Sequence, residues 1–424
     1  MIPLAVEEVR RLAPGRLEAR ADRVTGVTVD SRRAGPGDLF VAVGRGREFV
    51  AEALERGAAA VLVPDDPFGV LAALAAAVRG RSEAKVVAVT GSVGKTSTKD
   101  ILAALCRPHA ATVAAEAGFN NEIGLPLTLL AIEPETEIVV AEMGMRGLGQ
   151  ITELCGPARP DIGVITAVGP VHLELLGTVQ RVAEAKAELV AALPPGGTAV
   201  VPADAPELDP FLRRDDVELI RFGPGGDVRL ARFEPPVLAA DVRGTPVELE
   251  VPFTADHHAR NALAALGAYE ALGLPLERAG EGAAGIAFSR LRGEETELPG
   301  GALLINDSWN ANPVSMRAAL DYLVRRAAGR RTIAVLGEMA ELGEGAAAFH
   351  AEIGAAAAEL GIDVVIAVGG GLAARYGGLP AAKPAEAAGL VRELLEPGDV
   401  VLVKGSRVAR LETVAEALVG APAI

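Results

Sequence analysis

The chain has 424 residues, of which 50% are hydrophobic and 23% are charged, and its formal net charge is −15. This length is long for a single hydrophobic core and predicts about three domains. The acidic balance argues against nucleic acid or an anionic membrane as a partner, because both attract clustered Lys and Arg.

The N-terminus carries Glu7 and Glu8 where a signal peptide would be basic and then apolar. No run of about 18 apolar residues without charge follows. We therefore expect a cytoplasmic protein that does not insert into a membrane. As a separate expectation, we take the protein to be a monomer. Cys106 and Cys155 cannot form a disulfide framework and lack the close partners of a metal site, so we expect two buried thiols.

The first part of the chain predicts a small α/β domain over residues 1–83. Short runs rich in β-branched and apolar residues alternate with a helical stretch that Gly57 closes. The predicted strands are 24–29, 39–43 and 59–63, and the predicted helix is 49–56. A polar stretch at 79–84 reads as a linker.

The second part, residues 84–298, predicts a doubly wound parallel sheet. Buried apolar runs alternate with helical stretches, which is the rhythm of such a sheet. The predicted strands are 85–90, 138–141, 161–166 and 198–201. Residues 211–253, with Pro, Gly and alternating apolar positions, predict antiparallel strands at the edge of the sheet, and a helix at 259–272 follows.

The third part, residues 299–424, predicts a Rossmann-like domain. It again alternates strands and helices, but no G-x-G-x-x-G motif follows a strand. The predicted strands are 302–305, 332–336, 364–368 and 400–403, and the predicted helices are one after Pro313, 346–360 and 408–419. The fold class is therefore α/β throughout.

A phosphate-binding loop follows the first strand of the second part. Its residues are Gly91, Ser92, Val93, Gly94, Lys95, Thr96 and Ser97. The common loop has four residues between its first glycine and the Gly-Lys pair, whereas here there are two. Lys95 is suited to neutralising phosphates and the Thr96 hydroxyl to ligating Mg²⁺, while the competing interpretation is a Gly-rich turn between a strand and a helix.

Three further polar residues stand out, two of them where a doubly wound sheet binds its ligands. Glu142 directly follows the strand 138–141, and His172 comes after the strand 161–166. Lys186 lies inside a predicted helix in a chain that is poor in lysine. The alternatives are a solvated strand end for Glu142, a structural role for His172, and an ordinary surface lysine at position 186.

Several motifs, taken in chain order, resemble those of the Mur ligases, the ATP-dependent amide-forming enzymes of peptidoglycan synthesis. The shortened loop is similar to the ATP loop of that family. Further similar segments are 30–43, which resembles a UDP-binding segment, 118–130, 305–320, 334–344 and 401–407. The resemblance spans essentially the whole chain, and it implies a UDP-binding N-terminal domain and a central P-loop ATPase-like domain.

The resemblance implies a reaction and its cofactors. ATP would activate the C-terminal carboxylate of a UDP-N-acetylmuramoyl-tripeptide as an acyl phosphate, and D-alanyl-D-alanine would attack it. Thr96 and Glu142 would hold one Mg²⁺, and His172 a second. Lys186 matches a lysine that is carbamylated in the family and would support the second Mg²⁺. The catalytic positions would then be Lys95, His172 and Lys186.

The resemblance also implies further binding residues. His257 and Asn261 would contact the adenine, with His258 standing where Asn is frequent, and Asp307 and Asn310 would reach the ribose and phosphates. Capping of the following helix is the competing interpretation of Asp307 and Asn310. The substrate contacts would be Ser31, Arg32, Asn120, Asn121, Thr128, Asn310 and Asn312. Either Arg290 or Arg292 fits the position of an ATP-binding arginine.

Three rival functions are weighed against this one. A Mur ligase that adds the third residue of the peptide would carry an Asp-Asn-Pro-Arg motif, which is absent here. A folylpolyglutamate synthetase would lack the UDP-type N-terminal domain. An ATP-dependent scaffold protein would have no need of His172 and Lys186.

Overall fold

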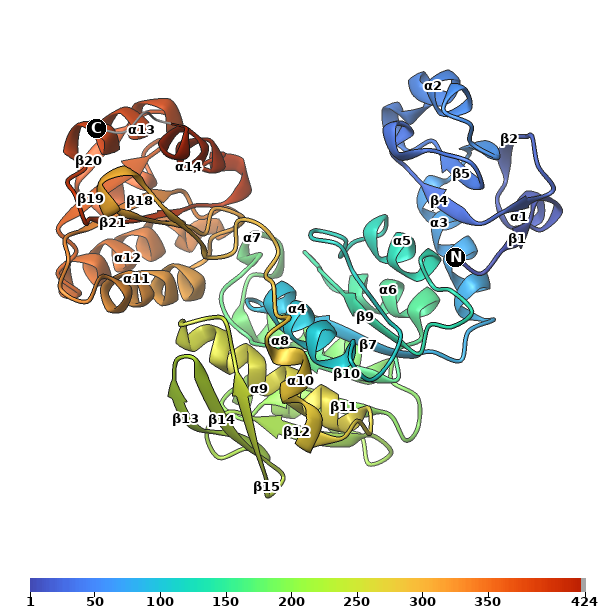
Figure 1. Cartoon of the computed structure of the whole chain (residues 1–424), viewed down its shortest axis with the longest axis horizontal. Coiled ribbons are helices and arrows are strands. Elements are labelled where there is room, and N and C mark those ends of the chain that lie inside the picture. The colour runs from blue at the N-terminus through green and yellow to red at the C-terminus, as the bar shows by residue number, and fades with distance from the viewer. Residues whose placement is uncertain (421–424) are drawn as a thin grey trace.

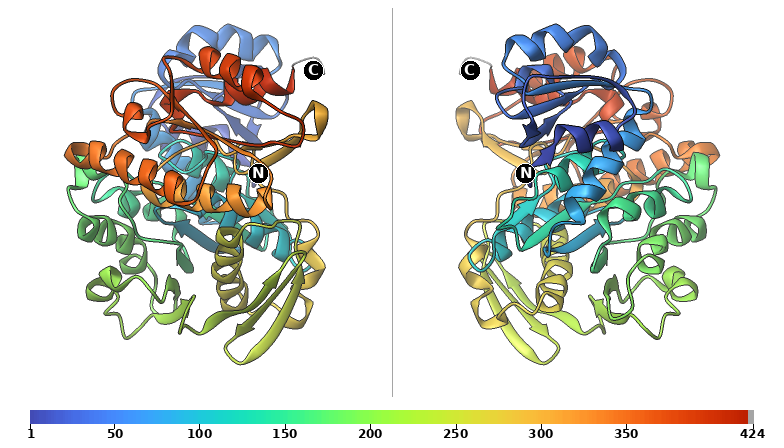
Figure 2. Two further views of the ribbon diagram at one scale, coloured as in Figure 1. Left: turned by 90° about the vertical axis from the view of Figure 1, so that its left-hand side faces the viewer. Right: turned by 90° about the vertical axis from the view of Figure 1, so that its right-hand side faces the viewer.

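The computed structural model describes residues 1–420 and contains three main sheets, one in each of three successive parts of the chain (Figure 1). Helices accompany every sheet, so the predicted α/β class is confirmed. The N-terminal and third parts lie on the same side of the central part (Figure 2). The domain boundaries themselves stay a prediction.

The N-terminal part has a 4-stranded sheet in the order β2-β6-β5-β4, and β1 pairs with β3 beside it. Its elements are β1 (Leu4–Ala5), α1 (Val6–Leu12), β2 (Gly15–Ala19), β3 (Arg23–Val24), β4 (Gly26–Thr28), β5 (Asp38–Val41), α2 (Val50–Glu55), β6 (Ala60–Pro64) and α3 (Pro67–Arg79). The predicted helix at 49–56 begins one residue later, because residues 44–49 form a 3₁₀ turn.

Helix α3, which the sequence analysis did not predict, joins the N-terminal part to the central one. Asp66 caps it by accepting from the backbone N–H of Phe68 and Gly69. Its buried Leu74 belongs to the same hydrophobic cluster as Leu125 and Leu129 of the central part. One continuous core therefore connects these two parts.

The central part has a 9-stranded sheet in the order β15-β14-β13-β12-β11-β10-β7-β9-β8. Its strands are β7 (Lys85–Thr90), β8 (Thr112–Ala114), β9 (Ile138–Glu142), β10 (Ile162–Ile165), β11 (Thr198–Pro202), β12 (Glu218–Phe222), β13 (Val228–Glu234), β14 (Val237–Val242) and β15 (Thr245–Glu250). Its helices are α4 (Lys95–Cys106), α5 (Gly124–Leu130), α6 (Gln150–Ala158), α7 (Leu173–Leu176), α8 (Val179–Ala191), α9 (Asp256–Ala271) and α10 (Gly280–Ala283).

The predicted antiparallel edge of this sheet is confirmed for β13, β14 and β15, which pair in sequence. Strand β12 differs from the prediction, because it lies parallel to β11 along its whole length. It therefore extends the doubly wound part of the sheet by one strand.

The third part has a 6-stranded sheet in the order β16-β17-β21-β18-β19-β20, in which only β16 is antiparallel to its neighbour. Its strands are β16 (Glu294–Glu297), β17 (Leu303–Asn306), β18 (Thr332–Gly337), β19 (Val364–Val368), β20 (Leu379–Ala381) and β21 (Val400–Lys404). Its helices are α11 (Pro313–Ala327), α12 (Ala346–Glu359), α13 (Pro384–Leu394) and α14 (Glu412–Val419).

Separate hydrophobic clusters cover the two faces of this sheet, with α11 and α12 in one cluster and α13 and α14 in the other. The Rossmann-like prediction is therefore confirmed. The predicted helix at 408–419 is shorter in the structure, because Arg410 has a φ of 51° and helix α14 begins only at Glu412.

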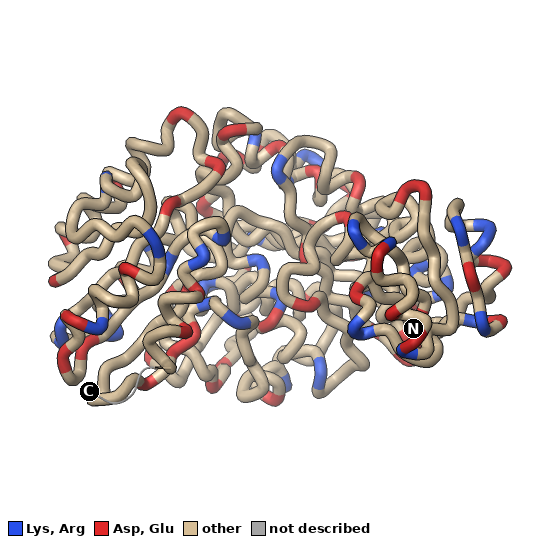
Figure 3. Tube along the Cα trace, turned by 90° about the horizontal axis from the view of Figure 1, so that it is seen from above, with Lys and Arg blue, Asp and Glu red and all other residues tan. Residues whose placement is uncertain are grey.

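Three properties of residues 1–420 agree with the composition of the chain. Acidic and basic residues alternate along the trace without one large basic region (Figure 3). Both cysteines are buried, and burial raises the pKa of each thiol to about 12. Within residues 1–420, no helix combines the length and apolar character needed to cross a membrane.

Candidate functional site

The shortened glycine loop connects the end of β7 to the start of α4. Gly91 and Gly94 have φ angles of 150° and 82°, which side chains other than hydrogen rarely tolerate. A Cβ at Gly94 would lie 2.3 Å from Oδ1 of Asn261, so the loop has room only for glycine there. The Lys95 ammonium donates to the carbonyl of Gly91 at 2.7 Å. The loop thus wraps around the N-terminus of α4, which is an anion-binding arrangement.

Glu142 forms a buried cluster with Thr96 and Asn120. The Thr96 hydroxyl donates to Glu142 Oε2 at 2.8 Å, and the Asn120 amide donates to Oε1 at 2.8 Å. Glu142 is only 1% exposed, which excludes a solvated strand end. A hydroxyl and a carboxylate beside a phosphate-binding helix end fit Mg²⁺, which takes oxygen ligands and completes its shell with phosphate and water.

No group of three or more His, Cys, Asp or Glu residues within the described part of the chain forms a metal site by itself. Thr96 and Glu142 therefore offer a partial set of ligands. This is the arrangement expected for Mg²⁺ that arrives with a nucleotide rather than in an all-protein cage.

Lys186 is buried inside α8, at 2% exposure, so it is no surface lysine. Within residues 1–420 it has no ion pair. Burial, aided by the nearby charge of Lys95, holds the pKa of the Lys186 amine well below its ordinary value. The structure therefore places a lysine without a counter-ion near the phosphate loop.

His172 lies at the start of α7 with a φ of 54°. Its Nδ1 is 2.5 Å from Oε2 of Glu341, which belongs to the third part of the chain. Burial lowers the pKa of His172, while Glu341 opposes the shift. His172 therefore reaches across the interface between the central and third parts.

Asp307 is held inside the third part by Lys404. The Lys404 ammonium donates to Asp307 Oδ2 at 2.6 Å and to the carbonyl of Asn310 at 3.0 Å, and Lys404 is only 2% exposed. The sequence analysis quoted the segment around Lys404 but assigned this residue no role. Its position at the end of β21 in a lysine-poor chain was the available signal.

Helix α11 is capped by Asn312 and not by Asp307 or Asn310. Asn312 Oδ1 accepts from the backbone N–H of Ser315 at 2.9 Å. In return, the Ser315 hydroxyl oxygen accepts from the backbone N–H of Asn312 at 3.1 Å. The capping alternative weighed for Asp307 and Asn310 thus applies to their neighbour. The Asn312 side chain is already engaged in this capping box.

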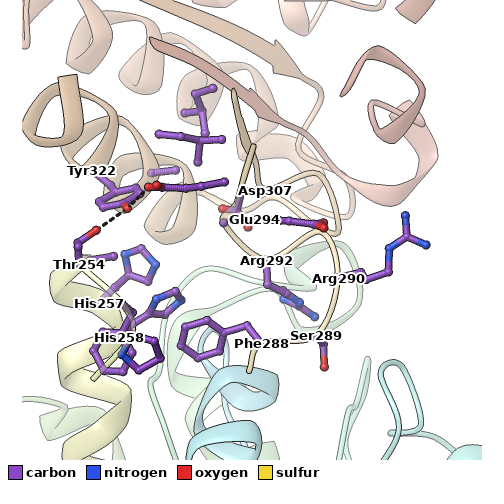
Figure 4. A pocket seen from close by; sticks show the side chains of 18 of the residues that line it. Thr254, His257, His258, Phe288, Ser289, Arg290, Arg292, Glu294, Asp307 and Tyr322 are labelled. Carbon is purple, nitrogen blue, oxygen red and sulfur yellow. Dashed lines mark hydrogen bonds between the residues drawn. The ribbon is translucent and has the colours of Figure 1, made fainter. Parts of the chain in front are cut away.

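Arg292, not Arg290, reaches the phosphate loop. Arg292 donates to the Thr96 hydroxyl at 3.1 Å and lies 5.5 Å from the ring centre of Trp309. In Figure 4, Arg292 points between Asp307 and Phe288, whereas Arg290 extends away from them. Of the two arginines that the sequence left open, Arg292 is the one bonded to the phosphate loop, and its contact with ATP stays a prediction.

A cavity of about 450 Å³ lies between the central and third parts. It brings together these predicted site residues: Ser92, Val93, Gly94, Lys95, Thr96, Ser97, Asn120, Glu142, His257, Asn261, Asp307, Asn310 and Asn312. Lys404, Arg292 and Trp309 also line it. His172 and Lys186 are not among its lining residues, although both are close enough to Lys95 for its charge to lower their pKa.

Other predicted substrate residues lie elsewhere. Ser31 donates to Glu52, and Arg32 pairs with Asp30, both in the N-terminal part. The Asn121 side chain accepts from the backbone N–H of Ile123 and Gly124 at the start of α5. Thr128 is buried and donates to the carbonyl of Gly124 within the same helix.

A second cavity, of about 350 Å³, adjoins the first and shares His257, His258, Arg292 and Asp307 with it. The His258 ring packs against Phe288 with centres 4.0 Å apart (Figure 4). On the opposite wall, Tyr322 and Thr254 share a hydrogen bond of 2.6 Å. This cavity offers aromatic surfaces, while the first offers charged and hydroxyl groups.

Comparison with known proteins finds two family models in the chain. The Mur ligase middle domain matches residues 89–269, and the Mur ligase, glutamate ligase domain matches residues 291–407. The UDP-N-acetylmuramoyl-tripeptide–D-alanyl-D-alanine ligase of Mycobacterium tuberculosis is 34% identical, over 99% of this chain and 98% of that protein.

Two solved structures are similar over nearly the whole chain. A crystal structure of MurF from Acinetobacter baumannii has a TM-score of 0.88 at 28% identity and covers 99% of both chains. MurF from Thermotoga maritima in complex with ADP has a TM-score of 0.81 at 29% identity and covers 93% of this chain and 96% of that one.

Proposed function

The chain belongs to the Mur ligase family, and from that premise we propose that it joins D-alanyl-D-alanine to a UDP-N-acetylmuramoyl-tripeptide in a reaction driven by ATP. The observation that carries this proposal is the cavity between the central and third parts. There a phosphate loop, an acidic Mg²⁺-type pair and residues of a second domain meet, in a chain similar over its full length to ligases of this name.

The chemistry follows from the weakness of a carboxylate as an electrophile. Direct attack by an amine would have to expel oxide. A tripeptide carboxylate oxygen instead attacks the γ-phosphorus of ATP, ADP leaves, and an acyl phosphate forms. The dipeptide amine then attacks the acyl carbon, loses a proton, and inorganic phosphate is expelled, so the protein must mainly position the groups and neutralise their charge.

The phosphate loop supplies most of that neutralisation. Its backbone N–H groups and the N-terminus of α4 face the phosphates, and Lys95 exchanges its bond to the Gly91 carbonyl for the β- and γ-phosphate oxygens. Thr96 and Glu142 would hold the Mg²⁺, which neutralises phosphate charge when it is bound. Arg292 adds a positive charge from beside Thr96.

The nucleoside end of ATP fits the other side of the same interface. We assign the adenine to the aromatic cavity of His257 and Phe288, and the ribose to Asp307 and Asn310. Asn261 packs against Gly94, so its role is at the phosphate loop as much as at the base. His258, which stands where Asn is frequent in the family, contributes a stacked ring.

Lys186 is proposed to react with CO₂ and form a carbamate. A neutral amine is the form that attacks CO₂, and burial near Lys95 favours the neutral form. The amine loses a proton as the N–C bond forms, and the product is an anion near the positive charge of Lys95. Together with His172 it would hold a second Mg²⁺ near the tripeptide carboxylate.

The remaining substrate contacts are assigned by position. Ser31 and Arg32 would receive the UDP end, and Asn120, Asn121, Asn310 and Asn312 stay candidates for the peptide and dipeptide, whereas the buried Thr128 hydroxyl is engaged inside α5. Because ATP and a UDP-linked peptide are both cytoplasmic metabolites, we propose that the protein acts there, as a monomer.

The test incubates the protein with Mg²⁺, ATP, UDP-N-acetylmuramoyl-tripeptide and D-alanyl-D-alanine, and follows phosphate release. We expect release that requires both peptide substrates. A matched reaction supplies UDP-N-acetylmuramoyl-dipeptide and a diamino acid, which a ligase for the third residue would use instead. ATP binding without substrate-dependent release would overturn the ligase function in favour of a scaffold protein.

A further inference from the structure

His172 is held by a carboxylate from another domain. Its Nδ1 lies 2.5 Å from Glu341 Oε2, and the two residues are 169 positions apart in the chain. A carboxylate can only accept a hydrogen bond, so Nδ1 carries the proton in this contact. In the neutral ring, the lone pair is then on Nε2.

Nε2 of His172 takes part in no hydrogen bond within residues 1–420. A histidine whose one nitrogen donates to a carboxylate and whose other nitrogen is left available has the arrangement of a metal-binding histidine. The carboxylate fixes both the tautomer and the orientation of the ring, and it makes the other nitrogen a better ligand.

The loop that carries Glu341 is shaped for this contact. Glu341 has a φ of 62°, an uncommon value for a residue with a side chain. Its carbonyl accepts from the backbone N–H of Glu174 at 3.3 Å. A Cβ on Gly343 would lie 3.2 Å from Cα of Glu174, so the loop following β18 packs closely against the start of α7.

A simple bridge between domains is the competing explanation. Arg146 of the central part also pairs with Glu341, at 3.4 Å, but the Arg146 side chain is 70% exposed. Exposed ion pairs of this kind contribute little to stability, because solvent and salt screen them. The shorter, less exposed contact to His172 therefore determines where the Glu341 carboxylate lies.

We propose that Glu341 is a positioning residue that orients His172 for metal binding, so that the second metal site is complete only when the third domain is docked. The proposal rests on the proposed function for the existence of that metal site. It adds that the site is built across two domains, one supplying the ligand and the other its orientation.

The experiment counts Mn²⁺ bound to the whole protein by electron paramagnetic resonance, with a non-hydrolysable ATP analogue and UDP-N-acetylmuramoyl-tripeptide present. We expect two ions in the unmodified protein. Glu341→Ala should weaken the second ion by about 10–100-fold, and Glu341→Gln, which retains an acceptor oxygen, by less. Arg146→Ala is the matched control and should leave both affinities within about twofold.

Two further measurements separate orientation from bridging. A His172→Ala, Glu341→Ala double variant should bind the second ion no more weakly than His172→Ala, because Glu341 acts through the histidine. Long-range ¹⁵N–¹H spectra should show the Nδ1–H tautomer of His172 in the unmodified protein. Thermal unfolding of each variant establishes that it is folded.

The proposal is overturned if Glu341→Ala binds the second Mn²⁺ as the unmodified protein does, if Arg146→Ala weakens it equally, or if His172 is the Nε2–H tautomer. Ligase failure is a separate result. Absence of amide product with the metal affinities as expected would overturn the proposed reaction and support the role of Glu341.

Discussion

The two sides of the main cavity are built differently. On the central side, Thr96 and Glu142 are bonded to each other and buried before any ligand arrives. On the third-domain side, Asp307 is bonded within its own domain and faces the phosphate loop only across an interface. Binding of phosphate is therefore preassembled, whereas completion of the site depends on how the domains dock.

The central side can be broken most severely at Lys95. Lys95→Ala removes the cation proposed to neutralise the β- and γ-phosphates, and we expect kcat/KM to fall by about 10³-fold, the scale for losing one preorganised charged donor. Phosphate release measures this effect. Lys85→Ala is the matched control, since Lys85 is exposed, pairs with Asp161 and lies outside the cavity. Equal losses in both variants would contradict the role of Lys95.

Lys186 tests whether the central side also needs an anion. Lys186→Ala should lower kcat by about 100-fold, because the proposed carbamate cannot form. Short carboxylates such as formate or acetate added to the assay should restore part of the activity of this variant and none of that of Lys95→Ala. Full activity in Lys186→Ala would remove Lys186 from the mechanism.

Arg292 tests the contact between the two sides of the cavity, because it donates to the Thr96 hydroxyl. Removing a buried, charge-assisted bond costs about 1.5–3 kcal/mol, so Arg292→Ala should lower kcat/KM for ATP by about 10–100-fold. Arg290→Ala should change it less, because Arg290 lines only the second cavity and has no hydrogen bond to the phosphate loop within residues 1–420. The reverse ranking in steady-state kinetics would contradict the assignment of Arg292.

The smallest effect is expected at Thr128. Thr128→Val keeps the shape of the side chain and removes one hydrogen bond inside α5, so it should cost about 1 kcal/mol of stability and leave KM for the tripeptide unchanged. A raised KM for the tripeptide in Thr128→Val would show that Thr128 contacts the substrate after all.

Asn120→Ala, from the same motif, removes a contact to Glu142 and should lower kcat/KM by about tenfold.

The difference between the two sides of the cavity also explains which site residues the sequence could predict. The loop Gly91–Ser97 and Glu142 were identified because each directly follows a buried apolar strand, which is a local signal. Most strands of the central sheet were found for the same reason, but the short β8 was not predicted and β12 was assigned to the antiparallel edge. Helix α3 was missed because its alanine-rich sequence gives weak periodicity, whereas α13 is amphipathic and was missed although its sequence carries that signal.

Contacts between distant residues left no such signal. Glu341 lies within the motif at 334–344, but the sequence assigned it no role of its own, because its partner His172 is 169 positions away in the chain. Lys404 was unassigned until the fold brought it to Asp307. The contact of Asn312 is different, because it caps α11 through a residue only three positions away. Such a contact leaves a local signal, and helix capping was accordingly considered for its neighbours Asp307 and Asn310.

The central claim is that one carboxylate is activated by phosphorylation and then captured by an amine. The direct measurement uses UDP-N-acetylmuramoyl-tripeptide with both oxygens of its C-terminal carboxylate labelled with ¹⁸O, and mass spectrometry of the products. The account predicts that one ¹⁸O appears in inorganic phosphate and one stays in the new amide carbonyl. Amide formation with unlabelled phosphate would contradict it.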